Sequence, residues 1–201
     1  VKVTRDLLAL LLTGFILATV FMSLGGFLTS LAQESWELGR AVIAFSLGSV
    51  ASAGTRQVLF ALPLVGFGLV ACWCWGTPLD LLLSGEEEAE SLGVDVPRVR
   101  WWVATWASVL VAAAVSLGGN IAFVGLIVPH ALRPFVGVGH RSLLLPSAIA
   151  GGVFVALCDL IARAIPSTTE VPLGVMTGLV GAPLFLALLL RARREEVVSG
   201  G

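Results

Sequence analysis

The sequence predicts an all-α integral membrane protein, a single polytopic helical bundle over residues 1–201 with about six transmembrane helices. Hydrophobic residues make up 57% of the chain and charged residues 12%, whereas soluble domains carry about 25% charged residues. Apolar runs of the length needed to cross hydrocarbon, about 20 residues, recur along the chain. Helices are expected because backbone groups in lipid must bond within their own segment, and no strand-like alternation runs through the chain.

Six apolar runs are candidate spans. They cover Leu7–Leu31, Val58–Trp75, Trp101–Leu117, Ile121–Val136, Leu145–Ile165 and Leu173–Leu190. The fourth run is short and contains Pro129 and His130 near its end, so we expect a broken helix there. The first run lacks a cleavage site, so we expect it to be retained as a span. The chain begins without Met, and we therefore expect a truncated or processed product.

The loop cations predict an orientation. An even number of spans places both termini on one side of the membrane, and cytoplasmic loops carry an excess of Lys and Arg. The side of the termini collects nine such residues, namely Lys2, Arg5, Arg98, Arg100, Arg133, Arg141, Arg191, Arg193 and Arg194. The opposite side holds Arg40, Arg56 and Arg163. Both termini are therefore expected in the cytoplasm.

The connection Trp36–Gln57 is mildly apolar and rich in small residues. We expect a short external helix from Leu38 to about Leu47, lying against the mouth of the bundle. The alternative is a simple interfacial connector.

The longest polar stretch, Thr77–Arg100, is expected in the cytoplasm between the second and third spans. Ser84 is a candidate N-cap and Gly93 a candidate C-cap of a helix of about two turns. The positive end of its dipole would be occupied by Glu86, Glu87 and Glu88. Ala89 and Leu92 share one face, which predicts a partner surface. A solvated acidic loop is the alternative.

Chemistry-bearing residues are sparse. Cys72, Cys74 and Cys158 lie in apolar stretches and are interpreted as small hydrophobic residues. No second ligand stands at metal-binding spacing from His130, so we expect no metal site. A net charge of −1 argues against a nucleic-acid partner. The chain has no phosphate-binding fingerprint and is not expected to hydrolyse ATP itself.

Several motifs carry a family resemblance. They are G-G-N-I-A-F-V-G-L-I-V-P-H-A-L-R at Gly118–Arg133, G-H-R-S-L-L-L-P at Gly139–Pro146, D-L-I-A-R at Asp159–Arg163, E-V-P-L-G at Glu170–Gly174, and G-A-P-L-F-L-A-L-L-L-R at Gly181–Arg191. In this order and spacing they resemble FecCD-type permeases, which serve siderophore, haem and cobalamin importers. The acidic segment S-G-E-E-E-A-E-S-L-G-V at Ser84–Val94 is similar to the cytoplasmic element of that family.

The chain departs from the family pattern at three positions. The family usually has Gly at Ala122, an acid at Gly139 and Trp near Phe45. The chain is also shorter than members of the family, because it resembles only spans five to ten of a ten-span type II importer permease.

The resemblance implies a subunit of an ABC importer in the bacterial cytoplasmic (inner) membrane. A second permease subunit, expected to form a homodimer, would pair with it, and a partner ATPase would bind ATP and Mg, so that the chain itself holds no cofactor. A periplasmic or lipid-anchored substrate-binding protein would deliver the iron-siderophore, haem or cobalamin-type cargo. The element expected to couple to the ATPase lies within residues 77–100 and comprises Gly85, Glu86, Glu87, Ala89, Leu92 and Gly93.

The resemblance also implies roles for the remaining motif residues. Arg163 would accept a carboxylate of the docked binding protein, with Arg40 and Arg56 as weaker candidates, and headgroup anchoring is the alternative. Asp159 stands four residues before Arg163, and we favour a structural ion pair. The bent end of the fourth span would be set by Gly125, Pro129, His130 and Arg133, and the last span by Glu170, Pro172, Gly181 and Pro183. Glu170 is equally explained as an acid that stabilises the helix dipole.

Two other classes of function are weighed against this interpretation. A membrane enzyme would show paired acids or a nucleophile with its base within spans, and neither is seen in the sequence. An ion-gradient-coupled secondary carrier would place coupling acids near the bilayer midplane. Asp159 lies near a span end, so the carrier remains the less favoured alternative.

Overall fold

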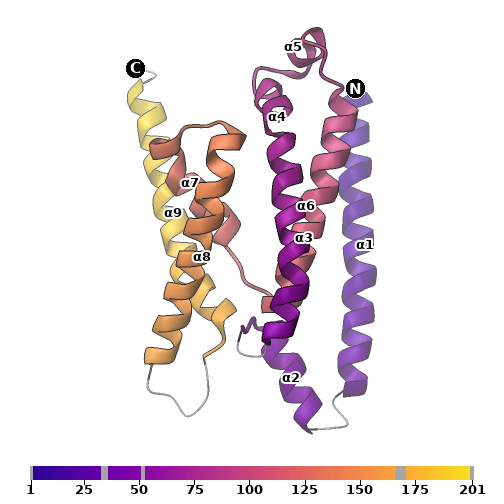
Figure 1. Ribbon diagram of the computed structural model, residues 1–201, viewed down its shortest axis with the longest axis vertical. Helices are drawn as coiled ribbons and strands as arrows, with labels where there is room; N and C mark the ends of the chain where they lie inside the picture. The colour runs from indigo at the N-terminus through magenta and orange to yellow at the C-terminus, as the bar shows by residue number, and fades with distance from the viewer. Residues whose placement is uncertain (1, 33–35, 51–52, 166–170, 200–201) are drawn as a thin grey trace. The chain divides into compact units, whose positions relative to one another are not determined.

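The computed structural model describes residues 2–32, 36–50, 53–165 and 171–199, and these ranges contain only helices and their connections (Figure 1). Five helices are long and apolar enough to cross a membrane. They are α1 (Lys2–Ala32), α3 (Thr55–Cys74), α6 (Val96–Gly118), α8 (His140–Ala164) and α9 (Leu173–Ser199). The all-helical membrane fold is confirmed.

The chain divides into two compact units, Val1–Ser46 and Leu47–Gly201. The first unit contains α1 and α2 (Trp36–Ser46). The short helix expected after the first span is thus confirmed as a helix, and its position at the mouth of the bundle stays a prediction. A methyl group on Gly25 or Gly26 of α1 would meet no atom within 4 Å, so neither glycine is needed for close packing within this unit.

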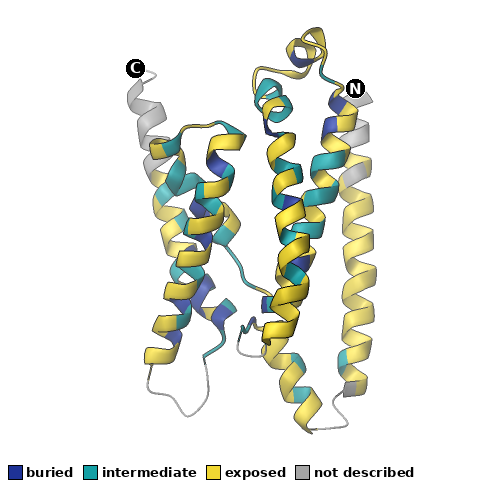
Figure 2. Cartoon of the chain, in the orientation of Figure 1, coloured by how far each residue is buried: buried dark blue, intermediate teal, exposed yellow. Residues whose placement is uncertain are grey.

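The second unit is built from a helix pair and a helix triplet. The pair is α3 and α6, and Gly68 permits their contact because a Cβ there would lie 2.6 Å from Leu110 Cδ2. The triplet is α7 (Val124–Val136), α8 and α9, which contact one another. Its buried cluster consists of Cys158, Ala162, Leu173 and Met176. Figure 2 shows that much of the surface of the long helices is exposed. Many of the exposed side chains are large and hydrophobic, which suits contact with lipid or with further protein.

The fourth predicted span contains the short helix α7, which is not among the five helices long enough to cross a membrane. Gly119 and Phe123 both have a φ of +67°, so the backbone leaves α6 and becomes helical again only at Val124. Thirteen helical residues rise about 20 Å, which is less than the about 30 Å of a hydrocarbon core. Among the described residues, five helices rather than the six predicted spans are long enough to cross a membrane, and the short one is the fourth. The expectation of a break near Pro129 and His130 is wrong, because α7 runs through both.

Away from α5, the segment before α3 bonds through its backbone to the end of α6 and to the start of α9. The Ser49 N–H donates to the Gly118 carbonyl at 3.0 Å, and the Gly174 N–H donates to the Gly48 carbonyl at 3.4 Å. A Cβ on Gly174 would lie 2.3 Å from the carbonyl oxygens of both Asn120 and Leu47. Only glycine allows this approach, which holds the start of α9 against the extended stretch before α7.

Candidate functional site

The polar stretch between α3 and α6 folds into a hairpin of two short helices, α4 (Gly76–Leu82) and α5 (Glu86–Ser91). The residue before α5 is Gly85, with a φ of +124°, and no side chain caps this helix. The expected N-cap at Ser84 is wrong because the Ser84 N–H bonds the Leu81 carbonyl and belongs to the turn that ends α4. The acidic first turn is confirmed, since α5 opens with three glutamates.

The other end of α5 is closed as expected. Gly93 has a φ of +84°, its N–H donates to the Glu90 carbonyl, and the Val94 N–H donates to the Ala89 carbonyl. These two bonds form a Schellman motif, in which the left-handed residue is normally glycine. The acidic stretch is therefore an ordered helix, and the alternative of a solvated loop is excluded.

Burial separates the two apolar residues that were expected to face a partner. Ala89 is 0% exposed, and Val96 and Val99 at the start of the contacting helix α6 are also buried. The expectation that Ala89 faces a partner is therefore wrong, because its own chain covers it. Leu92 is 61% exposed, and Leu83 at the end of α4 is equally exposed. The apolar surface of the hairpin is thus formed by Leu83 and Leu92.

The hairpin carries an acidic rim around these leucines. Glu86 pairs with Arg100 of α6, which orients the first turn of α5 toward α6. The other three acids of α5, Glu87, Glu88 and Glu90, are exposed. Two exposed leucines beside exposed carboxylates form a surface suited to a partner with an apolar cleft and basic groups.

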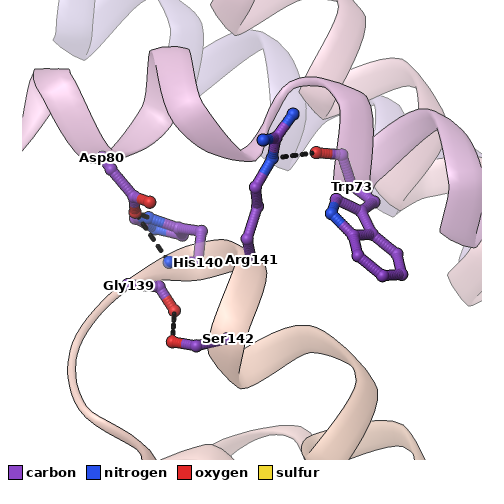
Figure 3. Close-up of polar contacts among 6 residues, drawn as sticks. All are labelled: Trp73, Asp80, Gly139, His140, Arg141 and Ser142. Atoms are coloured by element: carbon purple, nitrogen blue, oxygen red, sulfur yellow. Dashed lines mark hydrogen bonds and ion pairs between the residues drawn. The ribbon is translucent and has the colours of Figure 1, made fainter.

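Asp80 of α4 joins the hairpin to the first residue of α8 (Figure 3). Its Oδ1 accepts a hydrogen bond from the His140 backbone N–H at 2.6 Å and lies 2.7 Å from His140 Nδ1. Beside it, Arg141 Nε donates to the Trp73 carbonyl at 3.1 Å. Gly76 makes room for this arginine, because a Cβ there would lie 2.5 Å from Arg141 Cγ. Sequence reasoning missed Asp80, since its partner stands 60 residues later.

The residues expected at the end of the fourth span play other parts. A Cβ on Gly125 would meet nothing within 4 Å, so no neighbouring segment requires a glycine at this position. The Arg133 side chain makes no hydrogen bond within the described ranges, whereas its carbonyl accepts the Gly137 N–H at the end of α7. His130 is half-buried in α7, which packs on α8 and α9, whereas the hairpin packs on α8 through α4. Contact with the hairpin therefore comes from His140 and Arg141.

The residues assigned to the last two spans are placed as follows. Arg163 Nε donates to Asp159 Oδ2 at 2.7 Å, which confirms the ion pair expected within one helix. Gly181 allows close packing, because a Cβ there would lie 2.8 Å from Phe123 Cβ. The Pro172 carbonyl accepts the first hydrogen bonds of α9, and Pro183 is exposed within it. Glu170 lies outside the described residues.

The family of the chain is shown by its similarity to known proteins. The model of the FecCD transport family matches residues 2–191. The chain belongs to this family. As a FecCD chain, it is 43% identical over 180 residues to the cobalamin import system permease BtuC of Halobacterium salinarum, covering 90% of this chain and 47% of that protein. It is 35% identical over 192 residues to the molybdate import system permease MolB of Haemophilus influenzae, covering 94% of this chain and 56% of that protein.

A solved structure resembles this FecCD chain with a TM-score of 0.75 and 34% identity, over 89% of this chain and 57% of the other. It is an ABC transporter assigned to the metal-chelate type, in an inward-facing conformation. The chain spans about half the length of the curated relatives it matches.

The departure from the FecCD pattern at Gly139 has a structural counterpart. Gly139 is the N-cap of α8 and has no side chain with which to accept a hydrogen bond. The carboxylate that α8 lacks locally comes instead from Asp80. A carboxylate is favourable there because the first N–H groups of a helix lack partners within the helix.

The described residues contain no group of three or more His, Cys, Asp or Glu side chains that could hold a metal ion. A hollow of about 260 Å³ between α7 and α9 is lined by Ala131, Leu184, Ala187 and Leu188. This lining has no polar side chain to orient a small polar ligand.

Proposed function

We propose that this chain is the carboxy-terminal half of the permease subunit of an ABC importer. The observation that carries the proposal is membership of the FecCD transport family over residues 2–191. The two relatives compared above are import-system permeases, which supports the same role for the protein to which this chain contributes. ATP and Mg would bind to a separate ATPase subunit, and two permease subunits would pair around the transport path.

The hairpin α4–α5 would be the surface on which the ATPase docks. Leu83 and Leu92 are each 61% exposed, a state that burial in a partner's cleft would relieve. The exposed glutamates would face basic groups of the ATPase and set its orientation. The Gly93 cap and the buried Ala89 give the hairpin a defined shape, so a push on its tip would move the hairpin as one body.

We place the hairpin and both termini in the cytoplasm of a bacterium. Within the second unit, α5 and the end of α9 lie at the same end, and the end of α8 lies at the other (Figure 1). Arg163 is in the last turn of α8. The excess of loop cations on the hairpin side supports this orientation. Arg163 would then face a substrate-binding protein outside the membrane, with Arg40 and Arg56 as further docking candidates.

The cargo we propose is a bulky metal chelate of the iron-siderophore, haem or cobalamin class. Similarity to a cobalamin permease and to a metal-chelate type transporter supports it. The ion-gradient-coupled carrier is disfavoured, because Asp159 is already paired with Arg163 and is not poised as a coupling acid.

Reconstitution of the complete transporter in liposomes tests this function. Radiolabelled cyanocobalamin and a ferric siderophore are supplied with the binding protein, and ATP is enclosed on the side of the hairpin. We expect uptake that requires ATP, persists when ionophores collapse ion gradients, and stops when the ATPase lacks its catalytic acid. Uptake driven by an ion gradient without ATP would instead establish the carrier.

Labelling tests the orientation separately. Cysteine placed at Glu87, in a chain lacking Cys72, Cys74 and Cys158, should react with a membrane-impermeant maleimide only from the cytoplasmic side. Reaction from outside would invert the topology and exclude an ATPase-docking role for the hairpin.

A further inference from the structure

The helix pair and the helix triplet of the second unit are joined beside the hairpin by one polar junction. The residues of this junction are Trp73, Asp80, His140 and Arg141 (Figure 3). Trp73 and Asp80 belong to the α3–α4 side, and His140 and Arg141 form the first turn of α8. Because α7 and α9 both pack on α8, a displacement of α8 would involve the whole triplet.

The strongest link in this junction is the Asp80 carboxylate. One oxygen binds both the backbone N–H and the ring Nδ1 of His140, at 2.6 and 2.7 Å. The two side chains are 34% and 41% exposed, so water competes for the ring contact and an ion pair alone would stabilise the junction little. The backbone bond is different, because it satisfies the first N–H of α8, which has no partner within the helix, and places negative charge at the positive end of α8.

We propose that Asp80 is a positioning residue for transport, which ties the first turn of α8 to the hairpin so that displacement of α4–α5 is passed on to α8. This inference rests on the proposed function. A helix of 25 residues is about 37 Å long and stiff, so movement at His140 would reach the opposite end of α8, where Asp159 and Arg163 lie. Arg141, bonded to the Trp73 carbonyl, is the second contact that keeps the two sides in register.

An experiment can distinguish a role of Asp80 in capping α8 from a role in transmitting movement of the hairpin to α8. If Asp80 only caps α8, a carboxylate supplied by α8 itself should serve equally well. Gly139 has ordinary N-cap angles, with φ −65° and ψ 132°, so Asp fits there without backbone strain. The atoms nearest to a new Cβ would be Ser142 Oγ at 3.2 Å and Asp80 Oδ2 at 3.6 Å, and the second is absent once Asp80 is Ala. In the double variant Asp80→Ala/Gly139→Asp, the new carboxylate can accept the N–H of Arg141 or Ser142, so α8 regains an N-terminal carboxylate without the tie to the hairpin.

The experiment measures movement of α8 in the complete transporter without requiring a known cargo. Spin labels replace Val111 on α6 and Val153 on α8, which are 62% and 55% exposed, in a background lacking the three native cysteines. Distances are recorded before and after trapping with MgATP and vanadate. Basal ATP hydrolysis is measured in the same samples, and thermal unfolding reports on the cap.

We expect a trapping-dependent distance change in the parent and in Asp80→Asn, which keeps the acceptor oxygen. Asp80→Ala and the double variant should lose most of the change while still hydrolysing ATP, and only the double variant should regain thermal stability. His140→Ala keeps the backbone bond, so its distance change should lie between that of the parent and that of Asp80→Ala. Uptake of cyanocobalamin per ATP hydrolysed should drop about tenfold in Asp80→Ala, the effect of losing one charge-assisted hydrogen bond.

Asp95 provides the matched control. Its carboxylate caps α6 by accepting the Arg98 N–H at 3.1 Å and lies in the same polar stretch. Asp95→Ala should reduce stability but leave the α6–α8 distance change intact.

Three results would overturn the inference: a parent whose α6–α8 distance ignores trapping, an Asp80→Ala variant that moves normally, or a double variant that moves like the parent. The proposed function is judged separately, by ATP-dependent uptake in the parent. If α8 moves through Asp80 but the transporter takes up no chelate, the proposed cargo is refuted. The proposed coupling of α8 to the hairpin through Asp80 is then still supported.

Discussion

The guanidinium of Arg100 pairs with the carboxylate of Glu86, joining the first residue of α5 to the beginning of α6. Both side chains are more than half exposed, at 59% and 57%. Exposed ion pairs contribute about 0.2–1 kcal/mol, because water and salt screen them. The hairpin is therefore held mainly by its buried residues and by the cap at Gly93.

Replacing Glu86 with Gln should accordingly change little. We expect a loss of less than about 1 kcal/mol in the stability of the hairpin, and a smaller loss at high salt. Hydrogen exchange of residues 84–95 measures this local stability. A loss as large as that caused by removing the cap would show that the pair matters more than its exposure suggests.

Replacing Gly93 with Ala should open the end of α5. A Cβ there meets nothing within 4 Å, so the cost comes from the φ of +84° and amounts to about 1–2 kcal/mol. Exchange of the Gly93 and Val94 amides should accelerate about tenfold. Gly93→Asn, which tolerates this conformation better, should lie between Ala and the parent.

Replacing Gly174 with Ala should destabilise the second unit as a whole. The new Cβ would lie 2.3 Å from two backbone oxygens that cannot rotate away, so the three chain segments must separate. We expect a loss of about 1–3 kcal/mol or more in thermal unfolding in detergent. Gly178→Ala, one turn later with nothing within 4 Å, should be neutral, and equal losses in both variants would contradict this packing.

Replacing Leu92 with Asp should leave membrane insertion intact and uncouple ATP hydrolysis from uptake. The leucine is exposed in the chain and would be desolvated by the ATPase, where a carboxylate is costly. Leu83→Asp should behave alike. Ser91→Asp adds the same charge at an exposed neighbour and should remain coupled. Unchanged transport in both leucine variants would count against the docking surface.

Replacing Arg163 with Ala should slow the docking of the substrate-binding protein. Exposed charges act mainly on encounter, so we expect the association rate to fall several-fold at low salt and the difference to shrink at high salt. Asp159→Asn retains the arginine and should preserve docking. An unchanged association rate in Arg163→Ala would favour headgroup anchoring instead.

Local patterns predicted much of the fold. Apolar run length predicted the five long helices, and the sequence of the acidic segment predicted both its helical state and the cap at Gly93. The length of the apolar run did not predict where the helix of the fourth predicted span begins. There the helix starts only at Val124, after Asn120 has packed against Gly48 and Gly174, a contact between distant segments.

The candidate site also has features that the sequence predicted and features that only the folded structure shows. Helical spacing showed that Ala89 and Leu92 share a face, but it could not show that the folded chain buries the first and leaves the second exposed. Gly125 and Gly181 were equally plausible packing positions by composition. Only the second has a neighbour, Phe123, within contact of its Cβ.

The sequence by itself determined what depends on neighbours along the chain: membrane residence, the helical state of each span, and the acidic hairpin. Tertiary structure alone decided which surfaces remain available and that Asp80 caps α8 in place of a residue at Gly139. The physical reason is that hydropathy and helix caps act within a few residues. A hydrogen bond between residues 80 and 140 exists only once the helices between them have packed.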